Sequence, residues 1–210
     1  MYRLGALLIG YLLGGLQSAI LYGKLKGIDI RSQGSGNAGT TNTVRILGKK
    51  AGAIVLLVDV LKALFAIYLS KWIFGSMHPE TAILIGLYSG IGAILGHSFP
   101  LFFHFKGGKG IATTAGTLIG IDMRIFVISG ILFLVSFGVS RIVSISSLIM
   151  TASIPILIII FYSGQGSIGI EAMLLSFFIT GFTFYRHKAN IKRLIEGNEA
   201  KLTSKSKVRR

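Results

Sequence analysis

The sequence predicts an all-α integral membrane protein, a bundle of about seven transmembrane helices with the N-terminus outside and the C-terminus in the cytoplasm. The first observation is composition: of 210 residues, 52% are apolar and 14% charged, whereas a soluble domain carries about 25% charged residues to cover its surface. The second is the 28 glycines, which membrane helices use for close packing. The third is the position of the basic residues along the chain. Because the chain has no cysteine, disulfide scaffolds and thiolate metal sites are excluded.

A membrane-spanning helix needs about 20 mostly apolar residues. Seven segments of the sequence fit or approach this length: 3–23, 51–74, 81–98, 109–121, 124–139, 144–162 and 168–186. The fourth segment is short and begins in a glycine-rich polar stretch, so an alternative with five spans drops or merges the fourth and fifth. The first segment is not expected to be a cleaved signal peptide, because Arg3 is its only early charge and Gln17-Ser18-Ala19 is a poor cleavage site.

The orientation follows from the basic residues. With the N-terminus outside, 18 of the 22 lysines and arginines fall on the inside: six in the first inner loop, two in the second, one in the third and nine from Arg186 onward. This asymmetry is typical of cytoplasmic loops, and it removes the main argument for a nucleic-acid partner. We expect residues 1–200 to form a single membrane-embedded domain and 201–210 a basic, disordered cytoplasmic tail.

The first inner loop contains a glycine-rich stretch at 34–39 followed by threonines and Arg45. Its G-x-G-x-x-G pattern is not a dinucleotide fingerprint, because no strand precedes it. Its glycines still allow backbone N–H groups to converge on an anion. Thr40 or Thr41 is expected to cap the helix that follows, and Arg45 shares a helical face with Thr41. The alternative is a flexible polar loop.

The second inner loop opens a helix with the glycine-lysine loop, Lys106, Gly107, Gly108, Lys109 and Gly110. A helix N-terminus preceded by this loop predicts a phosphate site. No Ser or Thr follows the Gly-Lys pair, so the metal-holding hydroxyl of an ATPase loop is missing. The nearby His97 and His104 are either ligands or bases, or hydrogen-bonded anchors at the membrane surface.

Two further groups of polar residues are informative. His187, Asn190 and Arg193 recur at a spacing that places them on one helix face, and Gly197 suits the end of that helix. Within the second span, Asp59 and Lys62 lie three residues apart. Charges inside a membrane are usually paired or functional, so this pair either braces the bundle or lines the site.

Together these segments resemble the bacterial membrane glycerol-3-phosphate acyltransferases that use acyl phosphate. Three blocks carry the resemblance, at 35–45, 96–110 and 187–199. The resemblance implies a seven-span enzyme of the cytoplasmic (inner) membrane whose active site faces the cytoplasm. It would transfer an acyl group from acyl phosphate to the 1-hydroxyl of sn-glycerol 3-phosphate. The products would be 1-acyl-glycerol-3-phosphate (lysophosphatidate) and phosphate, in the first acylation of phospholipid synthesis.

The resemblance and the residue patterns together define the expected site. Catalytic roles are expected for Ser35, Ser144, His187 and Asn190; phosphate binding for Asn37, Thr41, Arg45, Lys106, Gly107, Gly108, Lys109, Gly110 and Arg193; and structural support for Glu199, Asp59, Lys62 and His97. Only the resemblance singles out Ser144 and Glu199. We expect no metal and no cofactor, because an acyl phosphate is already an activated anhydride. The base is either His187 or a substrate phosphate.

The expected partners are acyl phosphate, glycerol 3-phosphate, the lipid bilayer and an enzyme that produces acyl phosphate. A different class of protein, a small anion transporter or channel, would also suit basic loops and glycine-packed helices. A transporter or channel would be expected to have functional polar residues near the middle of the membrane and an internal repeat. Here the polar blocks lie at one face, which favours the enzyme.

Overall fold

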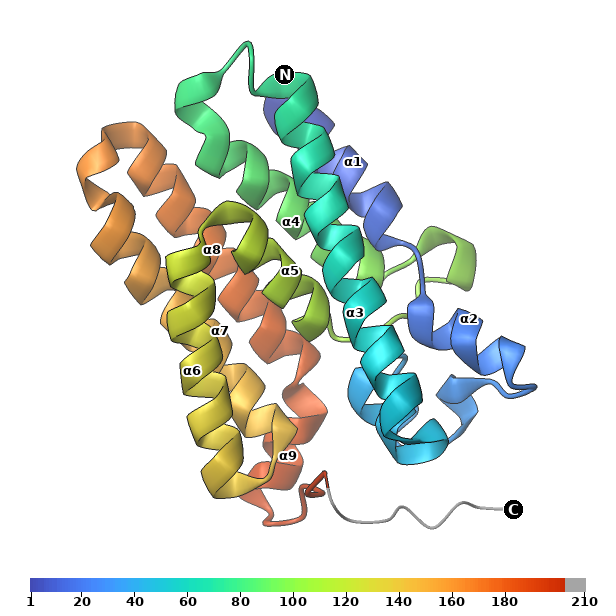
Figure 1. The fold of residues 1–210 in the computed structure, drawn as a ribbon. Helices are drawn as coiled ribbons and strands as arrows, with labels where there is room; N and C mark the ends of the chain where they lie inside the picture. Colours follow the sequence, from blue (N-terminus) through green and yellow to red (C-terminus); the bar gives the residue numbers. More distant parts are fainter. Residues whose placement is uncertain (203–210) are drawn as a thin grey trace.

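The computed structural model describes residues 1–202, and the remainder of the predicted basic tail, 203–210, lies outside the described residues. Within 1–202 the chain forms nine α-helices and four short 3-10 helices without any strand (Figure 1). The α-helices are α1 Tyr2–Gly14, α2 Ser18–Leu25, α3 Thr40–Phe74, α4 Ala82–Ser98, α5 Ile111–Ile121, α6 Met123–Ser140, α7 Val143–Tyr162, α8 Gly166–Arg186 and α9 Lys188–Ile195. The 3-10 helices are Ile30–Ser32, Pro79–Thr81, Leu101–Phe103 and Ser163–Gln165. The all-helical prediction is confirmed.

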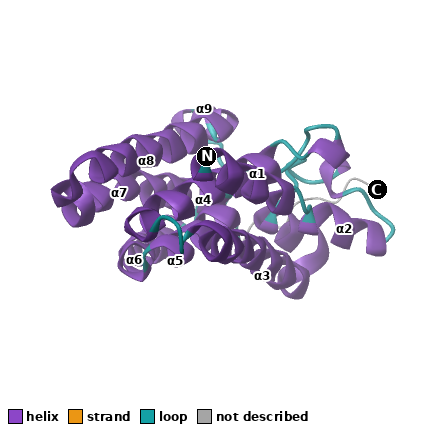
Figure 2. Cartoon of the chain, turned by 90° about the horizontal axis from the view of Figure 1, so that it is seen from above, coloured by secondary structure: helices purple, strands orange, loops and turns teal. Residues whose placement is uncertain are grey.

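Five helical runs among residues 1–202 are long and apolar enough to cross a membrane: Tyr2–Leu25, Thr40–Phe74, Pro79–Phe103, Met123–Ser140 and Val143–Arg186. The last run contains α7 and α8, of 20 and 21 residues. These two helices run alongside each other on one side of the bundle (Figure 2). The 11 residues of α5 span about 16 Å, roughly half of a bilayer core. The number of crossings therefore stays a prediction.

The first predicted segment, 3–23, is not one continuous helix. It breaks between α1 and α2, where Gln17 leaves the helical conformation with φ −100° and ψ 82°. The buried Gln17 amide donates a hydrogen bond of 3.1 Å to the carbonyl oxygen of His97. The break directs the Gln17 side chain toward His97 on α4. The number of apolar residues in the segment gives no indication of this contact.

Glycines set the spacing between α1 and the central helix α4. A Cβ atom at Gly10 or Gly14 of α1 would collide with the α4 backbone, and one at Gly92 or Gly96 of α4 would collide with the α1 backbone. The two backbones therefore touch directly, as small residues allow in membrane helices. The expectation that glycines serve close helix packing is confirmed at this contact.

Large apolar side chains cover the outside of the bundle. Trp72 is 79% exposed, Leu134 65% and Phe65 60%, and only 11% of α6 is buried. Water would not favour such a surface, but lipid does. The exposed surface therefore agrees with a membrane protein.

The start of α3 differs from the expected cap. Gly39 is the N-cap residue, and no side chain caps the helix. Thr40 is already helical, and its Oγ1 atom is buried without a hydrogen-bond partner among residues 1–202. The prediction that Thr40 or Thr41 caps the helix is wrong, because the extended glycine leads directly into the first turn. A break at Gly48, with φ 85°, separates the turns that carry Arg45 from the apolar part of α3.

The connections predicted to lie inside gather at one end of the bundle. The chain before α3, the turn between α6 and α7, and α9 lie at the end opposite the N-terminus (Figure 1). The chain before α5 contacts α9 through a hydrogen bond from Lys109 to Asn190. The three sequence blocks therefore meet in space.

Candidate active site

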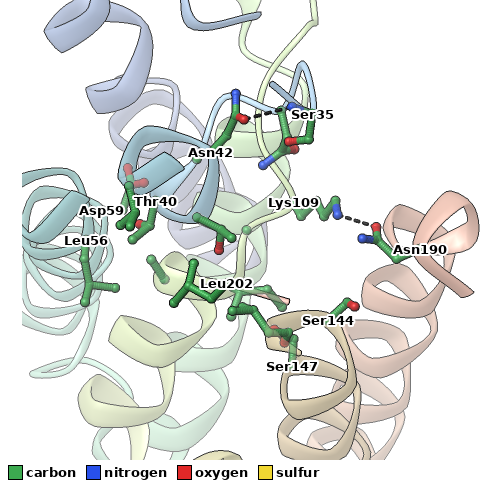
Figure 3. Close-up of a pocket in the computed structure, with 18 of the residues that line it drawn as sticks. Ser35, Thr40, Asn42, Leu56, Asp59, Lys109, Ser144, Ser147, Asn190 and Leu202 are labelled. Atoms are coloured by element: carbon green, nitrogen blue, oxygen red, sulfur yellow. Dashed lines mark hydrogen bonds between the residues drawn. The ribbon is translucent and has the colours of Figure 1, made fainter. Parts of the chain in front are cut away.

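A large cavity of about 1570 Å³ opens at this end of the bundle. Its labelled side chains come from the chain before α3, from α3 itself, from the glycine-lysine loop, and from α7 and α9 (Figure 3). Of the residues expected at the site, those that line the cavity are Ser35, Asn37, Thr41, Arg45, Asp59, His97, Lys109, Gly110, Ser144, His187, Asn190, Arg193 and Glu199. All three blocks contribute to it.

The glycine-lysine loop divides between two pockets. Lys106 and Gly107 line a separate pocket of about 370 Å³, together with Arg31 and Arg186. Lys109 and Gly110 line the main cavity. The exposed His104 lines neither pocket.

The Asn42 side chain holds the loop of the first block in place by hydrogen bonds. Its side-chain oxygen accepts a 2.9 Å hydrogen bond from the Ser35 backbone N–H, and its amide donates to the carbonyl oxygens of Ile30 and Gln33, each at 3.0 Å (Figure 3). This brings the loop back against α3 beside the cavity. Sequence analysis assigned Asn42 no role, and its only signal there was its position within the first block.

Backbone and arginine contacts hold the second block in place. The Gly108 N–H donates to the carbonyl oxygen of His97 at 3.1 Å, and Arg186 donates from Nη2 to the Gly108 carbonyl oxygen at 2.8 Å. A Cβ atom at Gly108 would collide with Nε2 of His97 and with the carbonyl oxygen of Ala38. The loop therefore requires glycine at this position.

Two of the helices that begin at the cavity, α3 and α5, have glycine N-caps that line it. Gly110, with φ 84°, is the N-cap of α5, and both Gly110 and Ile111 line the cavity. At α3, Gly39 and Thr40 do the same. The first N–H groups of a helix have no partner within the helix, and they carry its positive end. The cavity therefore offers two anion-binding helix ends.

The predicted pair of Asp59 and Lys62 is present beneath the cavity, and His97 joins it. Lys62 Nζ lies 2.8 Å from Asp59 Oδ1, 2.9 Å from His97 Nδ1 and 2.6 Å from the carbonyl oxygen of Leu16. An ammonium group has three protons and no acceptor, so His97 accepts at Nδ1 and carries its proton on Nε2. Ser18 donates a further bond of 2.8 Å to Asp59. The pair braces α2, α3 and α4, and Asp59 also reaches the cavity wall.

Glu199 organises the third block. Its Oε1 atom accepts from Ser144 Oγ at 2.8 Å and from Asn190 Nδ2 at 2.5 Å, and its Oε2 atom accepts from Arg193 Nε at 2.7 Å. Asn190 in turn accepts from Lys109 Nζ (Figure 3). Burial favours the neutral acid, but these three donors hold the pKa of Glu199 below its usual value. Glu199 thus joins α7, α9 and the glycine-lysine loop.

His187 is buried at the cavity, and one of its ring nitrogens forms a hydrogen bond to the backbone. Its Nδ1 atom lies 2.8 Å from the carbonyl oxygen of Thr183, and a carbonyl can only accept. The proton therefore lies on Nδ1, which leaves a lone pair on Nε2. Burial, with the positive charge of Lys109, lowers the pKa of His187 to about 4. At neutral pH the ring is uncharged and able to accept a proton or a hydrogen bond.

Lys109 titrates close to neutral pH. Burial lowers its pKa to about 8. The carboxylate of Glu199 opposes this shift, and the cations Arg193, Arg186 and Arg45 add to it. A region with four cations around one carboxylate favours an anionic ligand, and a dianionic phosphate would restore charge balance.

The chain after α9 also borders the cavity. Arg45 donates from Nη2 to the carbonyl oxygen of Ala200 at 3.2 Å, and the Leu202 N–H donates to the carbonyl oxygen of Arg141 at 3.1 Å. The Leu202 side chain lies among the cavity residues (Figure 3). Leu202 falls within the segment predicted as a tail, and sequence analysis gave no signal for this contact.

The part of the cavity farther from the polar blocks is apolar. It is lined from α3, α5 and α6 by Leu56, Leu57, Ile119, Phe133 and Leu134. Within residues 1–202 no three His, Cys, Asp or Glu side chains are grouped as metal ligands. The cavity therefore combines a cationic end with a long apolar arm.

The sequence matches the family model described as glycerol-3-phosphate acyltransferase over residues 4–197. The chain belongs to this family. It is thus a membrane acyltransferase, as the three sequence blocks indicated. Two similar glycerol-3-phosphate acyltransferases are those of Allorhizobium ampelinum, 41% identical with 96% of this chain and 93% of the relative covered, and Bacillus cytotoxicus, 42% identical with 93% and 92% covered.

Solved structures of a family member agree with the fold. The integral membrane glycerol 3-phosphate acyltransferase PlsY, in its glycerol 3-phosphate form, superposes with a TM-score of 0.83 at 32% identity, and 96% of each chain is covered. Its lysophosphatidic acid form gives 0.81 at 31% identity, with 96% of this chain and 95% of that chain covered. These similarities extend over nearly the whole chain, including all three blocks.

Proposed function

We propose that this acyltransferase transfers an acyl group from acyl phosphate to the 1-hydroxyl of glycerol 3-phosphate. The products are 1-acyl-glycerol-3-phosphate and phosphate, in the first acylation of phospholipid synthesis. One observation carries the proposal: a single cavity connects a cationic end to an apolar arm. Such a cavity suits a donor that has a phosphate and a fatty chain. The glycerol 3-phosphate and lysophosphatidic acid forms of PlsY support the acceptor and the product.

The cationic end has groups for two phosphates. Lys109 and the N-terminus of α5 form one set, and Arg45 with the N-terminus of α3 forms the other. Charge-assisted hydrogen bonds to phosphate are stronger than neutral ones, and helix N-termini bind phosphate without a metal. We assign the set with Lys109 to glycerol 3-phosphate, as the resemblance of the glycine-lysine loop implies, and the set with Arg45 to the donor.

The reaction needs little activation, because acyl phosphate is a mixed anhydride. The hydroxyl oxygen attacks the carbonyl carbon, the bond from that carbon to the phosphate oxygen breaks, and phosphate leaves with the electron pair. The hydroxyl proton passes to Nε2 of His187 or to a phosphate oxygen. His187 is uncharged before substrate binds, and the approach of phosphate anions raises its pKa toward the value that suits a base.

The remaining polar residues position these groups. Glu199 fixes Asn190, which in turn holds Lys109, and Ser144 shares the same carboxylate. Ser35 lies in the loop that Asn42 fastens to α3. We therefore place Ser35, Ser144 and Asn190 around the reacting atoms, with Glu199 as their support.

We also propose seven crossings, with the cationic end in the cytoplasm of a bacterial inner membrane. The support is the excess of lysine and arginine in the connections that gather at this end (Figure 1). An enzyme that produces acyl phosphate would then deliver its product from the cytoplasm. The polar residues lie at one end of the cavity, whereas a transporter would need them near the middle of the membrane.

The test is a comparison of donors. Purified protein in detergent is given labelled glycerol 3-phosphate with either palmitoyl phosphate or palmitoyl-coenzyme A. We expect labelled lysophosphatidate from palmitoyl phosphate alone. Product from the thioester alone would refute the donor assignment, and product from neither would refute the proposed reaction.

A further inference from the structure

One wall of the apolar arm is a single face of α6. The residues of α6 that line the cavity are Phe126, Gly130, Phe133, Leu134 and Phe137, with spacings of four, three, one and three residues. This pattern places them in one stripe along the helix. The helix begins at Met123, far from the polar blocks, and ends at Ser140 beside them. A lining residue nearer the start of α6 therefore lies deeper in the apolar arm.

The other walls make the arm a groove rather than a closed tunnel. Leu57 on α3 is 58% exposed, although it lines the cavity, so this side is open toward lipid. The deep end is different, because Phe126 packs against the hydrophobic core of the bundle. The groove therefore has an open side and a floor near Phe126.

Gly130 lies in the middle of this stripe and faces open space. A Cβ atom built at Gly130 meets no atom within 4 Å, although the residue lines the cavity. Gly116 of α5 is different, because a Cβ atom there would collide with the carbonyl oxygen of Val60. Helix packing therefore explains Gly116 but does not explain Gly130.

We propose that Gly130 sets the length of the acyl chain that the enzyme accepts, by leaving the groove open past the middle of α6. This inference rests on the proposed function, because it requires an acyl donor in the groove. It assigns a selectivity role to a residue that takes no part in the chemistry.

The length of the groove follows from helix geometry. Phe137 and Gly130 are seven residues apart, about 10 Å along the axis, and Phe137 and Phe126 are eleven apart, about 16 Å. An extended alkyl chain advances about 1.3 Å per carbon, given C–C bonds of about 1.5 Å. About eight carbons therefore fit between Phe137 and Gly130, and about thirteen reach Phe126. A side chain at 130 would leave room for a short acyl chain and exclude a long one.

The experiment compares octanoyl phosphate and palmitoyl phosphate as donors for the unmodified protein and for Gly130→Leu. We expect kcat/KM with palmitoyl phosphate to fall about tenfold or more, because each buried methylene contributes several-fold to binding. The value for octanoyl phosphate should stay within about threefold. Gly138→Leu is the matched control: Gly138 is also on α6 and also has no atom within 4 Å of a Cβ position, but it is not a lining residue of the cavity.

Several outcomes would contradict the inference. An unchanged ratio of the two donors in Gly130→Leu, or an equal loss with both, would refute the role of Gly130. The same shift of the ratio in Gly138→Leu would also refute it. If Gly130→Leu does not fold, as judged by thermal unfolding in detergent, Gly130→Ala replaces it. Its smaller side chain should lower the palmitoyl-to-octanoyl ratio in the same direction, and an unchanged ratio refutes the inference. Absence of activity with either acyl phosphate in the unmodified protein would instead refute the proposed function.

Discussion

The charge of Lys109 should control the affinity for glycerol 3-phosphate. Its pKa of about 8 means that raising the pH from 8 to 9 leaves about one ammonium in eleven, if the free enzyme titrates as a single group. A phosphate monoester has its second pKa near 6, so the substrate itself does not change charge in this range. If only the ammonium form binds phosphate, KM should rise about five- to sixfold from pH 8 to pH 9 and approach a tenfold rise per pH unit beyond that.

The assay measures the initial rate of lysophosphatidate formation at varied glycerol 3-phosphate from pH 7 to 9.5, in the unmodified protein and in Lys109→Arg. The guanidinium group stays charged throughout, so KM of Lys109→Arg should be independent of pH. Lys109→Met removes the charge at all pH values. The loss of a charged hydrogen bond worth about 1.5–3 kcal/mol should then raise KM roughly ten- to hundredfold at pH 7.

Two results would refute this reasoning. A KM that is constant to pH 9.5 in the unmodified protein would show that Lys109 does not titrate with a pKa near 8. An equal rise of KM in Lys109→Arg would show that another group causes the pH dependence.

Other predictions concern the chemistry, the support, the metal requirement and the topology. His187→Ala should lower kcat by about 10²–10⁴-fold with little change in KM. Replacement of the exposed His104 by alanine is the control and should change neither constant. If His187→Ala changed KM alone, a substrate phosphate would be favoured as the base. Glu199→Gln removes the carboxylate that three donors share and should destabilise the protein by about 2–4 kcal/mol, seen as a lower melting temperature in detergent; an unchanged melting temperature would contradict its role as a support. Dialysis against EDTA should leave turnover intact, and loss of activity that magnesium restores would disprove this. Cysteines introduced at Ser76 and Lys192 should react with a membrane-impermeant reagent from opposite sides, and labelling from one side would overturn the orientation.

Much of the helical arrangement was predictable, because the length of an apolar run is a local property of the sequence. The predicted segments at 144–162 and 168–186 correspond closely to α7 and α8. The break at Gln17 was not predictable, because it depends on a carbonyl group of His97 that lies 80 residues away. The cap of α3 was missed for a smaller reason: Gly39, in extended conformation, took the position expected for a threonine.

The sequence predicted which residues form the site better than it predicted the contacts between them. Arg45, Lys109 and His187 all line one cavity, as blocks on one side of a membrane should. The two lysines of one motif nevertheless separate: Lys106 lines a different pocket from Lys109, and Gly108 between them is held by His97 and Arg186. The central position of Glu199 depends on contacts between α7 and α9, and no spacing within a single helix contains that information.

The glycine contact between α1 and α4 makes the active site sensitive to changes far from it. Gly96 touches the backbone of α1, and the next residue, His97, supports the loop at Gly108 through its carbonyl oxygen and borders it through its ring. A methyl group added at Gly92 or Gly96 would push the two helices apart and carry His97 with α4. The loop would then move relative to α3, which packs on both helices. Variants of these glycines should therefore resemble substrate-binding mutants in kinetic assays, although neither glycine lines the cavity.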